Sequence, residues 1–342
     1  MKHITLGSTG ITTPQNAFGA LPVQRVPMGE AVRILRRAHE GGMTFFDTAR
    51  AYSDSEEKLG AAFGGMRGKI FIASKTMAKT PEQFWQQLTT SLHNLRTDYI
   101  DIYQFHCADQ CFAPGDGTGM YECMEKAKAE GKIRHIGITA HKLNVAQEAV
   151  ASGLYETLQF PFSYLSSKQE EDLVQSCRGK NMGFIAMKGL AGGLITNSRA
   201  AMAYMLQFDN ALPIWGIQRM EELEEWLAFM EKEPVLDDEL KAFIAEERKE
   251  LVGDFCRGCG YCMPCPAGIM INQCARMALM LRRAPSQNWL SDNMQAEMKK
   301  IEGCLTCGAC RTKCPYGLDT PALLKKNYED YKKVLAGEIR VQ

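Results

Sequence analysis

Short apolar runs alternate with amphipathic runs from residue 16 to about residue 230. The amphipathic runs have the spacing of helices, as at 30–42, 81–95 and 220–232. The apolar runs have the length of buried strands and lie at 16–21, 43–48, 69–74, 99–106, 134–139, 156–160, 183–187 and 212–217. Eight strands that alternate with about eight helices predict a (β/α)8 barrel, an α/β fold of the TIM type.

A doubly wound parallel sheet is the alternative architecture for such an alternating pattern. That fold usually carries a glycine-rich dinucleotide fingerprint directly after its first strand. No GxGxxG follows the first predicted strand here. The pattern therefore favours the barrel.

The character of the chain changes after Pro234. Residues 235–255 read as a linker helix, and further helical sequence lies at 271–283 and 291–303, between cysteine motifs. We therefore expect two domains. Residues 1–234 form the barrel, and residues 235–342 form a small all-helical metal-binding domain.

Composition excludes several classes of protein. The 342 residues are 45% hydrophobic and 23% charged with a net charge of zero, which is ordinary globular composition without a nucleic-acid footprint. No apolar stretch approaches the roughly 18 residues of a membrane span. The N-terminus has no secretory signal, so we expect a cytoplasmic protein with neither nucleic acid nor membrane as a partner.

Thirteen cysteines are the unusual feature of the composition, and nine of them lie between residues 256 and 314. An odd number in an unsecreted chain indicates metal or redox chemistry rather than disulfides. Two runs contain eight of the nine: Cys256, Cys259, Cys262 and Cys265 before Pro266, and Cys304, Cys307, Cys310 and Cys314 before Pro315. Cys274 fits neither run, and we expect it to be a buried helix residue.

Three cysteines at two-residue spacing can surround one iron–sulfur cluster, while the cysteine before proline binds the other cluster of a two-cluster ferredoxin. This logic predicts two [4Fe-4S] clusters. The first takes Cys256, Cys259, Cys262 and Cys314, and the second takes Cys304, Cys307, Cys310 and Cys265. Zinc is the alternative, but zinc modules favour separated CxxC pairs.

Four polar residues stand at or just after the ends of early predicted strands: Asp47, Tyr52, Lys75 and His106. In a barrel the carboxyl ends of the strands form the active site, so these side chains should converge. A lysine cation would lower the pKa of a nearby tyrosine, and Asp47 would orient Lys75. Taken singly, the four are also compatible with a loop cap, a rim aromatic, a surface charge and a strand-end histidine. Together they suit proton delivery to a carbonyl.

At this point the chain resembles the aldo-keto reductases, and as a whole it resembles the branch with a C-terminal [4Fe-4S] extension. The resemblance is carried by LGSTG (6–10), FFDTARAYSDSEEKLG (45–60), IASK (72–75), YQFH (103–106), RHIGITAH (134–141) and both cysteine runs. It implies a catalytic tetrad of Asp47, Tyr52, Lys75 and His106, with Tyr52 as general acid or base.

The resemblance also implies a nicotinamide cofactor, NADP or NAD, across the barrel top. Thr139 and Gln159 would hold its carboxamide, and Met187 would lie under its ring. The segment with Gly189, Leu190 and Gly193 would bind the pyrophosphate, and Gly216, Gln218 and Arg219 would lie at the adenosine phosphate. The choice of nucleotide is open there, because residues 221–250 hold 12 acidic residues and 4 basic ones.

The implied reaction interconverts a small carbonyl and its alcohol by hydride transfer. A hydride carries two electrons while each cluster passes one, so direct exchange between them is difficult. The clusters are therefore either structural or sensory, or they connect to a flavoprotein or ferredoxin partner. The alternative function is a ferredoxin-like electron-transfer subunit whose barrel is only a docking module.

Overall fold

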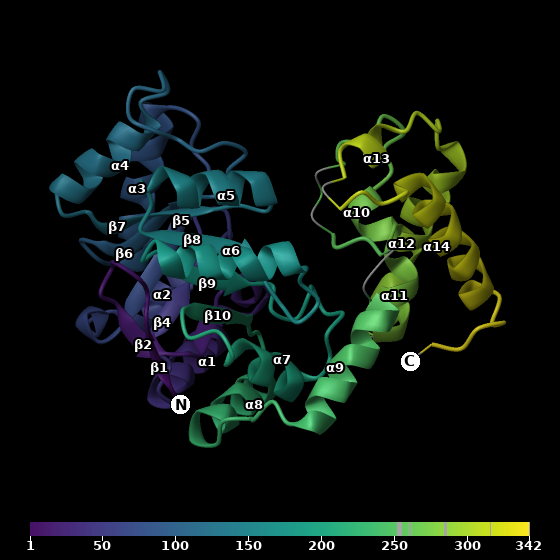
Figure 1. Cartoon of the computed structure of the whole chain (residues 1–342), viewed down its shortest axis with the longest axis horizontal. Coiled ribbons are helices and arrows are strands. Elements are labelled where there is room, and N and C mark those ends of the chain that lie inside the picture. Colours follow the sequence, from purple (N-terminus) through teal and green to yellow (C-terminus); the bar gives the residue numbers. More distant parts are fainter. Residues whose placement is uncertain (252–254, 259, 261, 284–285, 315, 342) are drawn as a thin grey trace. The chain divides into compact units, whose positions relative to one another are not determined.

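Eight parallel strands close into a barrel in the computed structural model, which describes the chain except residues 252–254, 259, 261, 284–285, 315 and 342. The strand order around the barrel is β10-β3-β4-β5-β6-β7-β8-β9. Figure 1 labels these strands apart from β3. The strands are β3 (Ala17–Gly19), β4 (Phe45–Asp47), β5 (Phe71–Thr76), β6 (Ile100–Phe105), β7 (Ile133–Thr139), β8 (Thr157–Pro161), β9 (Gly183–Met187) and β10 (Ala211–Gly216). The predicted (β/α)8 fold is confirmed.

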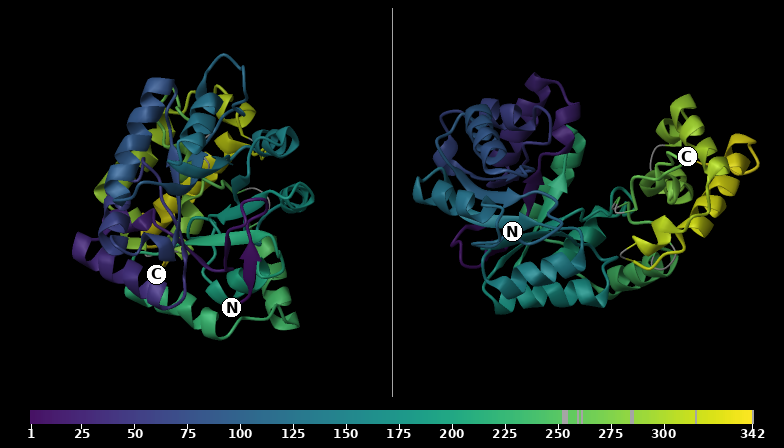
Figure 2. Two further views of the ribbon diagram at one scale, coloured as in Figure 1. Left: turned by 90° about the vertical axis from the view of Figure 1, so that its left-hand side faces the viewer. Right: turned by 90° about the horizontal axis from the view of Figure 1, so that it is seen from above.

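Helices lie outside this ring of strands (Figure 2). They are α1 (Met28–Glu40), α2 (Ser55–Phe63), α3 (Pro81–Leu95), α4 (Met120–Ala129), α5 (Leu143–Ser152), α6 (Lys168–Gly179), α7 (Ser198–Met205) and α8 (Met220–Glu231). Two of the helix starts show why the sequence forms them. The Thr80 hydroxyl accepts from the N–H of Gln83 before α3, and Ser167 and Glu170 form a capping box before α6.

An N-terminal hairpin precedes the barrel, and the sequence analysis missed it. Strands β1 (His3–Thr5) and β2 (Thr12–Pro14) pair antiparallel. Side chains in and between them, including Ile4 and Ile11, pack with residues of the barrel strands such as Phe45. The hairpin thus adds apolar volume to the barrel core. Strands of three residues have too short a period to be recognised in sequence.

Two compact units divide the chain. The first comprises residues 1–189 and 198–236, and the second comprises residues 190–197 and 237–342. The loop that leaves β9 therefore belongs to the second unit, although the strand itself belongs to the barrel. None of the helices among the described residues is long and apolar enough to cross a membrane.

The second unit is helical where it has regular structure, as expected. Its elements are α9 (Asp238–Leu251), α10 (Ile271–Cys274), α11 (Met277–Arg283), η3 (Ser286–Trp289), α12 (Asp292–Lys299), η4 (Lys300–Gly303), α13 (Ala309–Thr312) and α14 (Thr320–Leu335). Its buried side chains include Cys274, Met277, Leu281, Met298 and Tyr331. The helical sequence expected at 271–283 forms two short helices, with Ala275 and Arg276 between them.

Candidate active site and cysteine sites

The structure brings the four predicted barrel residues together. Asp47 ends β4, Lys75 lies in β5, and His106 directly follows β6. Tyr52 lies in the loop between β4 and α2 and is half-buried. Because neighbouring parallel strands end at the same edge, residues far apart in sequence meet there.

The contacts among these residues form a chain. The Lys75 Nζ atom donates to Asp47 Oδ1 at 2.6 Å and to the Thr48 carbonyl at 2.6 Å. The same ammonium lies 5.3 Å from the centroid of the Tyr52 ring. The Tyr52 ring meets the His106 ring edge to face, with the centroids 5.5 Å apart. Ammonium, phenol and imidazole therefore share one site.

Asp47 and Lys75 form an ion pair that is almost completely removed from solvent, with side-chain exposures of 3% and 1%. Burial raises the pKa of Asp47 and lowers the pKa of Lys75, because it disfavours both charges. The contact between the two groups opposes both shifts. Each charge therefore depends on the other, because removal of either partner would leave an uncompensated charge in the interior.

The expected lowering of the Tyr52 pKa is not found. Burial raises the pKa of Tyr52, and the nearby Asp47 carboxylate raises it further. Lys75 does not reverse this effect, because its charge is matched by Asp47 at 2.6 Å. The phenol therefore holds its proton in this state of the site.

His106 is also neutral. Burial and the positive charges that Lys75 and His141 can carry together lower the pKa of His106 to about 3. Its Nδ1 atom is buried and has no hydrogen-bond partner in the described structure. Burial and Lys188 lower the pKa of His141, which follows β7, to about 3 as well. At neutral pH the site thus offers neutral imidazoles beside a buried cation.

Sequence reasoning missed Gln104, which connects two parts of the barrel interior. Its Nε2 donates to Gln159 Oε1 at 2.9 Å, and Gln159 Nε2 lies 3.5 Å from Asp47 Oδ1. The period of two along β6 places Gln104 on the same face as His106, which is the signal that could have found it. Gln159, expected at a carboxamide, thus has partners within the barrel.

Thr139 ends β7 beside Gln159 in the sheet register. Its hydroxyl accepts from the N–H of Cys107 at 2.7 Å. Met187 ends β9 and is half-buried. The next expected nucleotide residue, Gly189, requires glycine because a Cβ there would lie 2.5 Å from the Trp215 ring.

The loop expected to bind pyrophosphate is closed on itself. The N–H of Gly193 donates to the carbonyl of Leu190 at 2.9 Å, and the N–H of Ile195 donates to the same carbonyl. Gly192 and Gly193 have φ angles of +69° and +92°, which favour glycine. In this form of the loop, the Gly193 amide is not open to a phosphate.

The segment after β10 is dominated by one carboxylate. Glu222 accepts from the backbone N–H groups of Gln218 and Arg219 at 3.0 and 3.1 Å. It also pairs with the Arg219 guanidinium at 2.8 Å. Gly216, at the end of β10, is exposed. The cation and the amides expected for a phosphate are therefore bound to a carboxylate at the start of α8.

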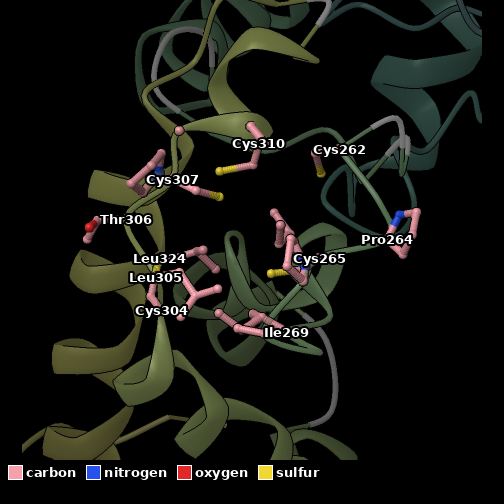
Figure 3. A pocket seen from close by; sticks show the side chains of 16 residues that line it. Cys262, Pro264, Cys265, Ile269, Cys304, Leu305, Thr306, Cys307, Cys310 and Leu324 are labelled. Carbon is pink, nitrogen blue, oxygen red and sulfur yellow. The ribbon is translucent and has the colours of Figure 1, made fainter.

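In the second unit, one cavity contains all four cysteines predicted for the second cluster. Cys265, Cys304, Cys307 and Cys310 line it, together with Cys262 at its edge and apolar side chains that include Leu324 (Figure 3). Thiols set in an apolar wall match the donor chemistry of an iron–sulfur cluster.

A second, smaller cavity contains the described cysteines predicted for the first cluster. Cys256, Cys262 and Cys314 line it. Cys259 and Pro315 lie outside the described residues. The N–H of Gly258 donates to the Cys256 sulfur at 3.4 Å. The cysteine before each proline thus lines the cavity of the other run, as the ferredoxin pattern predicts.

No disulfide joins the described cysteines, and Cys274 is buried in α10, as expected. Among described residues, no three His, Cys, Asp or Glu side chains gather as ligands of a single metal ion. One zinc ion needs its sulfurs at about 2.3 Å from a common point, whereas a cluster of several irons spreads them over a wider shell.

Comparison with protein-family models now identifies the class. Residues 3–226 match the aldo/keto reductase family, and residues 255–319 match a 4Fe-4S dicluster domain. The chain therefore belongs to the aldo/keto reductase family and carries a second domain of the iron–sulfur type.

Curated relatives agree with this assignment. L-galactose dehydrogenase of Arabidopsis thaliana is 31% identical over 212 residues, which are 56% of this chain and 66% of that protein. An aldo-keto reductase of Bacillus subtilis is 27% identical over 57% of this chain and 64% of its own length. The NADH-specific methylglyoxal reductase of Escherichia coli is 26% identical over 66% of this chain and 80% of its own. The chain thus spans less than two thirds of the length of the first two relatives.

Solved structures share the barrel fold. An aldo-keto reductase from Bacillus halodurans in its holo form has a TM-score of 0.64 at 22% identity, covering 74% of this chain and 98% of its own. An aldo-keto reductase from Klebsiella pneumoniae in complex with NADPH has a TM-score of 0.60 at 24% identity, covering 72% of this chain and 95% of its own.

Proposed function

We propose that this chain interconverts a small carbonyl compound and its alcohol by hydride transfer with a nicotinamide dinucleotide. The observation that carries the proposal is the contact chain from Asp47 through Lys75 and Tyr52 to His106 at one end of the barrel. A reduced nicotinamide, when bound, supplies the hydride. The protein's task is then to supply the proton and to hold the substrate oxygen.

Tyr52 is the proton donor in the direction of reduction. Its raised pKa keeps the phenol protonated, and the alkoxide that forms when a carbonyl accepts hydride is basic enough to take the proton. The neutral His106 imidazole can bind the same oxygen. Lys75, fixed by Asp47, then places its cation beside the tyrosinate that results. In oxidation of the alcohol the proton moves in the opposite direction.

The adjacent residues fit a nicotinamide ring at this position. Thr139 and Gln159 are neighbours in the sheet register, and His106 Nδ1 is a buried polar atom without a partner in the described structure. Glu222 selects against a 2′-phosphate, because it pairs with Arg219 and takes both nearby amides. We therefore propose a preference for NADH, which is also the specificity in the name of the E. coli relative.

Two [4Fe-4S] clusters complete the proposal. The first uses Cys256, Cys262 and Cys314 with Cys259, and the second uses Cys265, Cys304, Cys307 and Cys310. Support comes from the two cysteine-lined cavities and the dicluster family model. The clusters either stabilise the second unit or pass electrons to a flavoprotein or ferredoxin. Anaerobically purified protein should contain about eight irons per chain.

Replacement of Tyr52 by phenylalanine tests the assignment of the barrel. We expect kcat for reduction of small aldehydes and ketones to fall by about 10²- to 10⁴-fold, because the proton donor is lost. The affinity for NADH or NADPH, measured by quenching of nucleotide fluorescence, should stay near the wild-type value. Tyr103→Phe is the control, since Tyr103 is buried on β6 and packs on Phe84 of α3. Normal turnover in Tyr52→Phe would remove Tyr52 from this role. If the wild-type protein binds no nucleotide, the result would instead favour the alternative function, in which the chain is a ferredoxin-like electron-transfer subunit.

The nucleotide preference has a separate test. Glu222→Gln should raise the affinity for NADPH relative to NADH by about tenfold, because one charge opposite the 2′-phosphate is removed and Arg219 is released. Glu221→Gln is the matched control, since Glu221 is exposed in the same first turn of α8. An unchanged affinity ratio in Glu222→Gln would contradict the preference.

A further inference from the structure

Arg276 stands out among the charged residues of the second unit. It lies between α10 and α11, and its neighbours Ala275 and Met277 are buried. Its Nε atom is buried without a hydrogen-bond partner in the described structure. A half-buried guanidinium is costly unless a negative group is near it. The packing around Arg276 shows where such groups could lie.

Two glycines from separate segments lie close to the guanidinium of Arg276. A Cβ on Gly258 would lie 3.0 Å from the guanidinium carbon and Nη1 of Arg276, and a Cβ on Gly192 would lie 3.1 Å from Nη1. Both glycines have φ angles near +70°. Gly258 follows Cys256, a ligand proposed for the first cluster, by two residues. Gly192 lies in the loop proposed to bind pyrophosphate.

The guanidinium therefore lies close to two segments where negative charge is expected. Cys256, in the first segment, would hold the first cluster. The 190–197 loop would bind the pyrophosphate if it gave up its internal hydrogen bonds from Gly193 and Ile195 to Leu190. A phosphate bound to that loop and a cluster bound by Cys256 would compete for the same cation.

We propose that Arg276 is an electrostatic link between the nucleotide loop and the first cluster, so that dinucleotide affinity and cluster potential are coupled. The inference rests on the proposed function, since it needs both groups to bind. It goes beyond that function because it gives the cluster a defined effect on the barrel without electron transfer between them. Arg276 acts here as a positioning residue, through its charge.

The sign of the coupling follows from the charges. A dinucleotide that draws Arg276 toward its phosphates removes positive charge from the cluster, which stabilises the oxidised form and lowers the midpoint potential. By linkage, reduction of the cluster must weaken dinucleotide binding by the same factor. We expect about a five- to tenfold change in affinity, which equals about 41 to 59 mV for a one-electron couple.

The test uses anaerobic full-length protein with ADP-ribose, which has the pyrophosphate but no nicotinamide and so cannot exchange hydride. Its affinity is measured by calorimetry with clusters oxidised and reduced. The midpoint potential is followed by electron paramagnetic resonance with and without ADP-ribose. The wild type should show both changes, with equal coupling energies. Binding that is independent of the cluster's oxidation state would overturn the inference while leaving the proposed function intact. Protein without clusters or without dinucleotide binding would overturn both.

Variants of Arg276 distinguish the effect of its charge from the effect of its size. Arg276→Gln should lower the potential without ADP-ribose and make it insensitive to ADP-ribose, whereas Arg276→Lys should keep part of the coupling because it keeps the charge. Arg282→Gln is the matched control, since Arg282 lies in α11 and pairs with Asp330. It should behave as the wild type. Wild-type coupling in Arg276→Gln would also overturn the inference.

Discussion

The candidate active site and the cysteine cavities are built in different ways. In the barrel, protein atoms alone complete the arrangement: Lys75 reaches Asp47 and the Thr48 carbonyl at 2.6 Å. Asp47 pairs with β5, and Lys75 pairs with β6, in the sheet register. In the second unit, the cysteines lie mostly in loops, and the nearby helices α10 and α13 have four residues each. The first site is organised by backbone hydrogen bonds and burial, whereas the second needs ligand bonds to fix its loops.

This difference has a functional consequence. A site fixed by a barrel can hold a high-energy arrangement, such as a buried ion pair beside a phenol with a raised pKa, because strands on all sides maintain it. A site fixed by its metal group instead responds to the state of that group. We therefore expect the two units to differ in how they respond to the loss of a metal group.

Removal of iron should produce the largest change and should affect only one region. With the clusters chelated under reducing conditions, the cysteine-containing segments at 256–268 and 304–318 lose the bonds to iron, so limited proteolysis should cut there. Residues 1–189 should remain protected, because their core is apolar and needs no metal. Mass spectrometry of the fragments checks both regions. If the cysteine-containing segments stay resistant to proteolysis after complete loss of iron, the proposed difference between the two units would be contradicted.

Cysteine variants test the exchanged ligand pattern within the second unit. Cys314→Ser and Cys265→Ser should each reduce iron from about eight to about four per chain, but from different clusters. Cys314 lines the cavity of Cys256 and Cys262, and Cys265 lines that of Cys304. Electron paramagnetic resonance should therefore show a different remaining signal in each variant. Cys274→Ser is the control and should keep its iron, since Cys274 is buried in α10. Identical spectra from the first two variants would refute the pairing.

Within the barrel, two buried lysines allow a matched comparison. Lys75 and Lys58 both bind a carbonyl and a carboxylate, but Asp47 is 3% exposed whereas Asp54 is 43% exposed. Lys75→Met should lower the free energy of unfolding by about 3–5 kcal/mol, because it leaves Asp47 charged and buried. Lys58→Met should cost about 1–3 kcal/mol, because Asp54 reaches water. Urea unfolding measures both.

A double variant shows whether the buried charge is the cause. Asp47→Asn combined with Lys75→Met removes the isolated carboxylate, so it should recover a large part of the loss seen in Lys75→Met alone. If the Lys75 and Lys58 single variants lose equal free energy of unfolding, the burial of the partner carboxylate does not determine the loss.

The sequence predicted the barrel and the approach of its tetrad, because strand alternation places each strand end at the same edge. The positions of Asp47, Lys75 and His106 at neighbouring strand ends could thus be predicted without knowledge of any side-chain contact. It could not predict the sign of the Tyr52 shift, because that depends on how closely Asp47 neutralises Lys75. Nor could it find Arg276, since 271–283 has the pattern of one continuous helix. Breaks of that kind come from tertiary packing rather than local preference.

A further predicted effect concerns pH and the two neutral imidazoles. The pKa values of His106 and His141 are lowered to about 3, while their unfolded values lie near 6.5. Between these values the unfolded chain binds more protons than the native protein, so stability decreases as pH falls below about 6.5. At pH 5 each histidine should cost up to about 2 kcal/mol relative to pH 7.5.

His141→Gln should remove about half of this pH dependence, because the substituted amide does not titrate. His93→Gln is the control, since His93 is exposed on α3. Urea unfolding at pH 7.5 and pH 5, followed by tryptophan fluorescence, gives the difference for each variant. If His141→Gln kept the full wild-type decrease between the two pH values, His141 would not be held neutral by its burial. The barrel mouth would then tolerate a protonated imidazole, which would weaken the distinction between its fixed electrostatics and those of the cysteine loops.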